Sequence, residues 1–399
     1  MTDDHTNFAS NARYHRQMLL PGIGADGQAR ISAARVLVMG CGALGCALID
    51  HLARAGIGSL VLVDRDIVEL TNLQRQMLYT EADVGSATPK AHAAAAAVAR
   101  INRNVECTPH ATDFRAANAQ ALASGCDVIV DGLDSFETRY LLNDLSVHTG
   151  TPYIYGGAVG TSGMSLPLLP AEADGPCLRC LFDEPPAAGT TATCDTAGVL
   201  GPVIAMVAAR QAAETIKLLA AGPEAVDRRL TTVDVWSGRH HAADVTGARR
   251  ADCPTCGQRD FAWLEGRRGV TAAKLCGRGA VQIDGGGGTG GRTEGRTGGK
   301  TGGQTGNETS DGTATEAAAA AAAVGGTAGT STLADIAARL AAHGDFVENE
   351  WLVRGRLRDV RSRRGEPIDL TIFADGRTLV HGTDDPVEAR AIHARYVGH

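Results

Sequence analysis

Arg35-Val-Leu-Val-Met-Gly40-Cys-Gly-Ala-Leu-Gly45, with the residues that follow to Asp66, is the stretch that decides the fold. The apolar segment Arg35–Met39 predicts a short buried strand that enters a turn rich in glycine. We expect an apolar helix from about Cys46 to Ala55, then a second strand, Leu60–Val63, that ends in Asp64-Arg65-Asp66. Strand, glycine turn, helix, strand and terminal acid, in this order, are typical of a nucleotide-binding α/β sheet.

Each glycine of the turn has a physical role in holding a phosphate. Gly40 permits the tight turn, Gly42 lets the backbone approach phosphate oxygens, and Gly45 lets the helix lie close to the strand. The helix N-terminus offers unpaired N–H groups and partial positive charge to an anion. Asp64 follows Gly40 by 24 residues, about where a ribose-binding carboxylate is expected. The fingerprint alone fits both a dehydrogenase and an ATP-using enzyme.

Two cations that follow the turn favour a triphosphate ligand. The polar segment Asp66–Gln76 has neither helical nor strand periodicity, so we expect a loop at the carboxyl end of the second strand. Arg75 lies in this loop, and a guanidinium can contact phosphate through two N–H groups. Pro89 begins an alanine-rich helix, which places Lys90 at a helix N-terminus, where a cation opposes the helix dipole unless an anion is near. A solvated surface lysine is the alternative for Lys90.

Further alternation of strands and helices extends the sheet. Strands are expected at Asn104–Pro109 and at Cys126–Asp131, with Asp134 just past the carboxyl end of the latter. After another helix, a strand at Pro152–Tyr155 continues the alternation, and Gly156–Gly160 opens a different region. Because crossovers between parallel strands are right-handed, the pattern predicts an α/β fold with a Rossmann-like, doubly wound, mostly parallel sheet.

Composition narrows the class of protein. The chain has 399 residues, 44% of them hydrophobic, and a net charge of −7, which does not favour a nucleic-acid partner. No apolar run is long enough to span a membrane, and the polar segment Met1–Asn11 does not read as a signal peptide. We therefore expect a cytoplasmic protein whose ten cysteines are reduced.

Shifts in composition divide the chain into a large and a small folded part. Few residues of the Gly/Thr/Ala-rich segment 285–330 could bury apolar area, so a disordered linker is expected there. After it, a helix capped by Ser331 or Thr332 and several strands predict a small α+β module. The predicted parts are a disordered N-terminus 1–12, a nucleotide-binding domain 13–270, a possible first strand of the module within 271–284, the linker 285–330 and the module 331–399.

The cysteines suggest a metal site and one reactive thiol. Two Cys-x-x-Cys pairs, Cys177/Cys180 and Cys253/Cys256, suit a structural zinc site with four thiolate ligands. A redox pair and unpaired core thiols are the alternatives. Cys194 precedes an expected helix N-terminus, an environment that lowers a thiol pKa, although an inert buried cysteine fits as well.

Taken together, residues 13–257 resemble the MoeB/ThiF/HesA family, prokaryotic relatives of ubiquitin-activating enzymes. The order and spacing of many motifs carry the resemblance. The matching stretches are Arg13–Gln17, Gly40–Gly45, Asp64–Asp66, Asn72–Gln76, Pro89-Lys90, Asp134, Cys194–Val199 and both Cys-x-x-Cys pairs. The resemblance implies an adenylyltransferase that uses MgATP to activate the C-terminal glycine of a small ubiquitin-like sulfur carrier ending in Gly-Gly, with release of pyrophosphate.

The resemblance also implies residue roles. Asp64 would bind the ribose, Asp134 would position Mg²⁺, and phosphates would be held by Asn72, Arg75 and Lys90. The full nucleotide site implied is Gly40, Gly42, Ala43, Gly45, Asp64, Asp66, Asn72, Arg75, Lys90, Asp134 and Ser135. Ala43 stands where the family often has Gly, and Ser135 where it usually has Asn.

Two further roles implied by the resemblance involve groups outside this nucleotide site. The family's counterpart of Arg16 reaches the nucleotide of a partner subunit, which implies a homodimer. Cys194 matches a cysteine that some members use for a thioester or persulfide. The carboxylate of the carrier is already ionised, so its attack on the α-phosphorus needs cations to offset repulsion rather than a general base.

Two other functions are open at this stage. An NAD-dependent oxidoreductase on the same fold would leave Arg75, Lys90 and the paired cysteines unexplained. A non-catalytic module that docks a ubiquitin-like partner is favoured only by Ser135.

Overall fold

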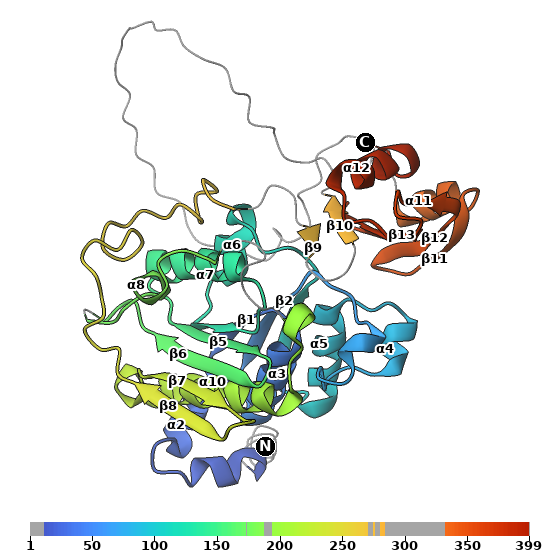
Figure 1. Ribbon diagram of the computed structural model, residues 1–399. Helices are drawn as coiled ribbons and strands as arrows, with labels where there is room; N and C mark the ends of the chain where they lie inside the picture. Colours follow the sequence, from blue (N-terminus) through green and yellow to red (C-terminus); the bar gives the residue numbers. More distant parts are fainter. Residues whose placement is uncertain are drawn as a thin grey trace, which may run out of the picture. The chain divides into compact units, whose positions relative to one another are not determined.

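The computed structural model describes residues 12–172, 174–186, 194–269, 274–275, 280–283 and 332–398 (Figure 1). It divides into two compact units, Met1–Thr271 and Ala272–His399. The expected disordered N-terminus and linker, apart from residue 12, lie outside the described residues.

The first unit is built on an eight-stranded sheet in the order β3-β2-β1-β4-β5-β6-β7-β8. The first five strands of the chain are parallel to one another, and the last three pair antiparallel, which confirms the expected mostly parallel α/β sheet. The strands are β1 (Arg35–Met39), β2 (Ser59–Val63), β3 (Glu106–His110), β4 (Val128–Asp131), β5 (Tyr153–Val159), β6 (Ser162–Leu168), β7 (Leu230–Asp234) and β8 (Arg239–Ala243).

Helices cover both faces of the sheet, as Figure 1 shows. Alternate residues of β1 point to opposite sides, so Val36 packs in a core with α3, α5 and α10, whereas Leu37 packs in a second core with α6 and α7. The helices are α2 (Gly24–Ala33), α3 (Ala43–Ala55), α4 (Glu81–Gly85), α5 (Lys90–Ile101), α6 (Ala116–Ala123), α7 (Phe136–Thr149), α8 (Leu178–Leu181), α9 (Cys194–Ala197) and α10 (Gly201–Ala221), with 3₁₀ turns η1 (Leu70–Asn72) and η2 (Pro223–Ala225).

Several local expectations were wrong, each for a physical reason. Gly156 does not open a new region, because β5 continues through it. Glycine is needed at this position because a Cβ there would lie 2.3 Å from the Gln211 side chain of α10. The predicted loop 66–76 contains η1. The sequence also predicts a strand at Leu230–Trp236, but β7 ends at Asp234. The Asp234 carboxylate accepts the N–H groups of Trp236 and Ser237 and starts a turn into β8, which was not predicted.

The second unit is a six-stranded antiparallel sheet in the order β11-β12-β13-β14-β10-β9, with two helices. Leu370 of β13 and Leu340 of α11 belong to its core, and Thr332 and Asp385 cap the two helices through their side chains. The elements are β9 (Lys274–Leu275), β10 (Ala280–Ile283), α11 (Leu333–Leu340), β11 (Gly344–Glu348), β12 (Leu352–Arg361), β13 (Pro367–Phe373), β14 (Thr378–His381) and α12 (Pro386–Tyr396).

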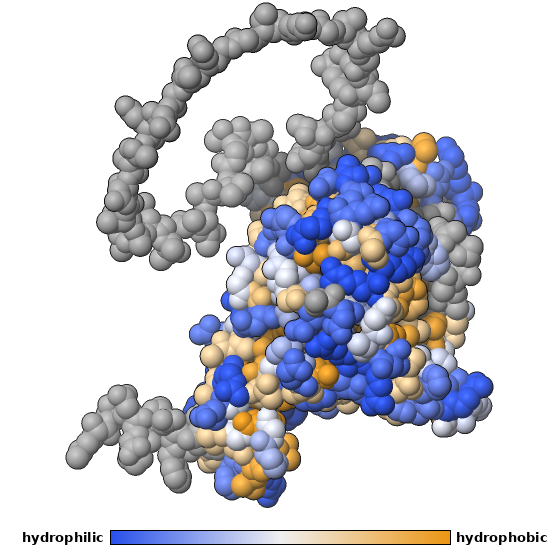
Figure 2. All heavy atoms as spheres, turned by 90° about the vertical axis from the view of Figure 1, so that its left-hand side faces the viewer, coloured by the Kyte–Doolittle hydropathy of each residue, from blue (hydrophilic) through white to orange (hydrophobic). Residues whose placement is uncertain are grey.

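Figure 2 shows one face of the molecule, on which hydrophobic and hydrophilic side chains are mixed. Among the described residues, none of the helices combines the length and the apolar character that a membrane-spanning helix needs.

Candidate nucleotide and metal sites

Three glycines meet where β1 and β4 end beside the start of α3. Gly40 has a φ of +83°, and a Cβ on it would lie 2.8 Å from the carbonyl oxygen of Gly132. A Cβ on Gly45 would lie 1.9 Å from the carbonyl oxygen of Gly40, and one on Gly132 only 2.6 Å from that oxygen. Side chains are therefore excluded at all three positions by the crossing of the backbones.

Gly42 is different, because space is open beside it. A Cβ there would come no closer than 4.0 Å to Gln76 Nε2 and to the Gly132 carbonyl oxygen. Gly42 is also the N-cap of α3, whose first turn carries no acidic residue. The unpaired N–H groups at the start of a 13-residue helix thus lie where no side chain of Gly42 would block the approach of an anion.

Asp64 ties the glycine turn to the end of β2. Its Oδ2 accepts the N–H of Cys41 at 2.7 Å, and its Oδ1 accepts the N–H of Asp66 at 2.7 Å. Burial raises the pKa of Asp64, while the nearby charge of Lys90 acts in the opposite direction. Each carboxylate oxygen retains a further lone pair that can accept a ligand hydroxyl.

Lys90 is buried, so its interpretation as a surface lysine was wrong. Its Nζ donates to Asp66 Oδ2 at 3.0 Å, its side chain is 4% exposed, and its backbone N–H donates to the Asp66 carbonyl oxygen at 2.8 Å. The Tyr79 hydroxyl donates to the Cys41 carbonyl oxygen at 2.6 Å and lies 3.2 Å from that of Lys90. These contacts fix the start of α5 beside the glycine turn.

The loop after β2 contains polar side chains that differ in burial and in hydrogen bonding. Asn72 is 2% exposed, and its Oδ1 accepts the N–H of Glu69 at 3.1 Å. Arg75 is half-buried and donates from Nη1 to the Thr71 carbonyl oxygen at 2.9 Å, within its own loop. Gln76 was not singled out from the sequence, yet it is 4% exposed and its Oε1 has no hydrogen-bond partner in the described structure. A ligand donor beside Gly42 would satisfy that buried oxygen.

Asp134 lies past the end of β4 and is exposed. Its charge reaches Arg65: burial lowers the pKa of Arg65, but the carboxylates of Asp66, Asp113 and Asp134 together outweigh burial and raise it. Arg65 forms an ion pair with Asp113 at 3.2 Å. Ser135 occupies the N-cap position of α7 without a side-chain capping bond. Asp134 is thus available to a divalent cation at the same edge as the glycine turn.

Arg16 is not brought to this edge. It is exposed on a helix of residues 12–18, which docks against the far end of α3: Gln17 Nε2 donates to the Ala55 carbonyl oxygen at 3.1 Å, and the Tyr14 hydroxyl accepts from Asn102 Nδ2 at 2.7 Å. Since α3 begins at the glycine turn and has 13 residues, this end lies about 20 Å away. Arg16 therefore does not serve the nucleotide site of its own subunit.

The four cysteines of the two Cys-x-x-Cys pairs converge in the interior. Their sulfur atoms all lie within 4.8 Å of one another, with 3.6 Å between Cys177 and Cys253 and 3.3 Å between Cys180 and Cys256. Four buried sulfur ligands fit a closed tetrahedral zinc site, which leaves no open position for chemistry.

Helix α7 supports both cysteine loops. Asn143 Oδ1 accepts the N–H of Leu178 at 2.7 Å, and its Nδ2 lies 3.8 Å from Cys177 Sγ. Asp144 Oδ1 accepts the Thr255 hydroxyl at 2.8 Å, and Oδ2 accepts the N–H of Trp263 at 2.9 Å. The backbone of Cys194 begins α9, but its side chain lies outside the described residues.

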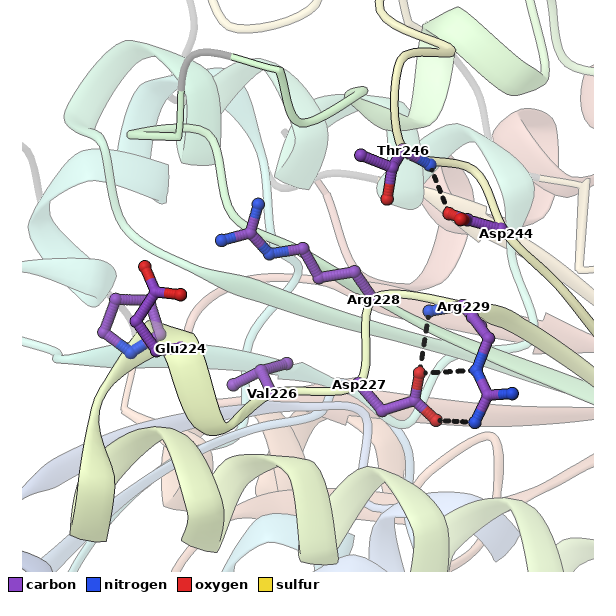
Figure 3. Close-up of a pocket in the computed structure, with 8 residues that line it drawn as sticks. Glu224, Val226, Asp227, Arg228, Arg229, Asp244 and Thr246 are labelled. Carbon is purple, nitrogen blue, oxygen red and sulfur yellow. Dashed lines mark hydrogen bonds and ion pairs between the residues drawn. The ribbon is translucent and has the colours of Figure 1, made fainter.

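A hollow of about 360 Å³ lies elsewhere, at the amino end of β7 (Figure 3). Its arginines are already paired, Arg229 with Asp227 at 2.9 Å, and Arg228 with Glu172 at 3.1 Å and Asp174 at 3.2 Å. No ligand is assigned to it.

Comparison with known proteins places these observations in a family. The model of the ThiF family matches residues 14–255. The sulfur carrier protein ThiS adenylyltransferase of Bacillus subtilis is 35% identical over 387 residues, 97% of this chain and 99% of the relative. The SAMP-activating enzyme E1 of Haloferax volcanii is 42% identical over 246 residues, 62% of this chain and 88% of the relative.

Solved structures agree on the fold. The structure of E. coli MccB with ATP matches with a TM-score of 0.51 at 22% identity, over 61% of this chain and 74% of that chain. MccB in complex with N-formylated MccA matches with a TM-score of 0.54 at 22% identity, over 63% of this chain and 76% of that chain.

Proposed function

The chain belongs to the ThiF family, and from that membership we propose that it is a nucleotidyltransferase that activates a small ubiquitin-like sulfur-carrier protein with ATP. The C-terminal glycine carboxylate of the carrier attacks the α-phosphorus of ATP, and acyl-adenylate and pyrophosphate are the products. The B. subtilis relative, matched along nearly its whole length, is named for such an activity on ThiS. The two relatives act on different carriers by name, so the carrier of this chain is left as a class.

One observation carries the proposal: a buried lysine is held by Asp66 beside the glycine turn, and α3 begins at that turn with Gly42 as its N-cap. Lys90 is fixed next to the glycine turn by Asp66, while the space beside Gly42 is free of protein atoms at contact distance. Positive charge held there offsets the repulsion between a carboxylate and a triphosphate, and the charge that develops on leaving pyrophosphate. A dehydrogenase has no need of such a buried cation.

The remaining residue roles are those that the family resemblance implies. Asp64 accepts a ribose hydroxyl, Asn72 and Arg75 contact phosphates, and Asp134 binds Mg²⁺ that accompanies ATP. Arg75 reaches the phosphates by leaving Thr71, a contact within one loop that costs little to exchange. The complete set proposed for the nucleotide is Gly40, Gly42, Ala43, Gly45, Asp64, Asp66, Asn72, Arg75, Lys90, Asp134 and Ser135.

A homodimer completes the site. Arg16 is exposed about 20 Å from the glycine turn of its own subunit, which is compatible with the family resemblance, in which this arginine serves a partner's nucleotide. In a mixed dimer of an Arg16→Ala chain and a Lys90→Met chain, one of the two sites has both residues, Lys90 from the first chain and Arg16 from the second. Exchange activity should therefore reappear in the mixture. No recovery in the mixture would rule out the shared site.

The other proposed features concern zinc, localisation, Cys194 and the division of the chain into domains. Zinc bound by Cys177, Cys180, Cys253 and Cys256 stabilises the first unit, and the protein works in the cytoplasm. Cys194 is the candidate for a thioester or persulfide after adenylation. We keep the division into a nucleotide-binding domain 13–270, a linker 285–330 and a module 331–399 as the working description of the chain.

The test is ATP–pyrophosphate exchange with purified carriers that end in Gly-Gly. Exchange should depend on the carrier, and a carrier lacking the last glycine serves as the control. Exchange should be lost in Lys90→Ala and in Arg75→Ala. Wild-type exchange in both variants would refute the assigned roles, and NADH binding without ATP binding would refute the function.

A further inference from the structure

The structure contains a buried arginine that the mechanism above does not use. The guanidinium of Arg139, on the first turns of α7, contacts three separate segments. Nε donates to Asp131 Oδ2 at 3.0 Å, and Nη2 donates to the carbonyl oxygens of Leu133 at 2.5 Å and Gly156 at 2.8 Å. One side chain thus joins the end of β4, the loop after it, and β5.

The pair is sealed from water. Asp131 is fully buried and the Arg139 side chain is 6% exposed. The Tyr153 hydroxyl donates to Asp131 Oδ2 at 2.7 Å, and the Phe136 and Tyr155 rings lie 5.5 and 5.3 Å from the guanidinium carbon. A buried ion pair is often no more stable than apolar residues of the same volume, so stability alone is a weak reason for this arrangement. What the pair supplies is geometry.

The bonds made by Asp131 and Arg139 hold Leu133, the residue before Asp134. The Leu133 N–H donates to Asp131 Oδ1 at 2.9 Å, and the Leu133 carbonyl accepts from Arg139. Because a peptide unit is planar, fixing that carbonyl fixes the plane of the bond that leads into Asp134. Arg139 and Asp131 therefore set the direction in which the backbone delivers the Asp134 carboxylate.

Helix α7, which carries Arg139, is itself held in place by hydrogen bonds to the two cysteine loops. One turn after Arg139, Asn143 holds the first cysteine loop and Asp144 holds the second. Helix α7 thus cannot slide along the sheet without breaking these bonds, and Arg139 reaches its three acceptors from a rigid base.

We propose that Arg139 is a positioning residue, which with Asp131 holds the 132–134 loop so that Asp134 can bind the divalent cation that accompanies ATP. The proposal rests on the proposed function for the identity of the ligand. Partners that orient a metal-binding carboxylate commonly change metal affinity about ten- to hundredfold when they are replaced.

The variant that tests this is Arg139→Lys, which keeps the charge but cannot bond Asp131, Leu133 and Gly156 together. Binding of a non-hydrolysable ATP analogue is measured by calorimetry over a range of Mg²⁺ concentrations. The half-saturating Mg²⁺ concentration should rise about tenfold or more, while binding of the analogue in EDTA changes little. Because the readout is binding, it does not depend on turnover.

The matched control is Tyr140→Phe, the next residue of the same helix. It also loses a hydrogen bond, from the Tyr140 hydroxyl to the Phe182 carbonyl oxygen at 2.8 Å, but that bond does not involve the 132–134 loop. It should keep the wild-type Mg²⁺ dependence. If Arg139→Lys does not fold, Tyr153→Phe replaces it, with a rise of about fivefold from one lost bond to Asp131.

The outcomes separate the two proposals. An unchanged Mg²⁺ dependence in the folded variants, or an equal rise in Tyr140→Phe, would overturn the role of Arg139. A wild-type protein that binds the analogue with Mg²⁺ but exchanges no pyrophosphate with any carrier would overturn the proposed function. The role of Arg139 would then still be decided by the Mg²⁺ dependence of analogue binding in the variants. A wild-type protein whose analogue binding ignores Mg²⁺ would overturn the role of Arg139 at once.

Discussion

Replacing Lys90 separates its structural contribution from its contribution to activity. In Lys90→Met the apolar side chain fills most of the same volume, but Asp66 loses a partner at 3.0 Å. Asp66 is 19% exposed, so it is partly hydrated, and the cost lies below the range for a fully buried pair. We expect a loss of about 2 kcal/mol in the free energy of unfolding, as for a charge-assisted hydrogen bond.

Activity should fall by much more than this stability loss explains. A fixed cation at the transferring phosphate contributes about 10²- to 10³-fold to the rate, as measured for single donors that stabilise developing negative charge. Lys90→Met should therefore lose about that factor in the rate of pyrophosphate exchange at saturating ATP, at a temperature where the variant is fully folded. Thermal unfolding should show a midpoint lower by about 4 to 8 °C.

A double variant distinguishes the two effects. Lys90→Met with Asp66→Asn removes the carboxylate that has lost its Lys90 partner, so most of the lost stability should return. Exchange should stay low, since the cation is still absent. Recovery of exchange in the double variant would mean that Lys90 acts only through the fold, and wild-type exchange in the single variant would refute the reasoning entirely.

Four further predictions concern the pH dependence of ATP binding, the pH dependence of stability, zinc and Cys194. Because Lys90 opposes the rise that burial causes in the pKa of Asp64, the pKa of Asp64 should rise further in Lys90→Met; the acid limb of ATP binding should then move to higher pH, whereas an unmoved limb would show that Asp64 is not the titrating group. The folded pKa of Asp64 is raised above the unfolded value, so its contribution to stability is fully present below the unfolded pKa and is lost as pH rises through the folded pKa. The free energy of unfolding should therefore fall less between acid and neutral pH in Asp64→Asn than in the wild type; urea unfolding at two pH values measures this, and an equal fall would contradict it. Chelation of zinc should lower the unfolding midpoint of the first unit, and metal analysis should find one zinc per chain; a chelated protein with an unchanged midpoint contradicts a structural metal. Cys194→Ala should keep carrier adenylation, and mass spectrometry of the wild type after turnover should detect a carrier adduct at Cys194 if that thiol is covalent; loss of adenylation itself would contradict this order of steps.

The buried position of Lys90 is the clearest case in which local sequence left two answers. A lysine after a proline at a helix start fits a solvated surface as well as a ligand site. The alternatives were separated by packing, since Tyr79 and Asp66, far from Lys90 along the chain, close around the start of α5. For Arg75 the structure does not choose between the alternatives. Its described bond is to Thr71 in the same loop, and its contact with phosphate stays a prediction.

The sequence by itself predicted the fold around the glycine turn and the two cysteine pairs that cluster in the structure, because both depend on short spacings. Glycines at 40, 42 and 45 with an acid after the next strand permit few arrangements, and paired Cys-x-x-Cys turns aim sulfur atoms at one point. Only the tertiary structure decided which side chains stand around them. Arg139 reads in the sequence as one more helix cation. Its proposed role appears only when the fold brings the Asp131 carboxylate and the carbonyl oxygens of Leu133 and Gly156 within reach of one guanidinium. Hydrogen bonds between a helix, a loop and two strands leave no periodic trace in the order of residues, so no local pattern could have predicted them.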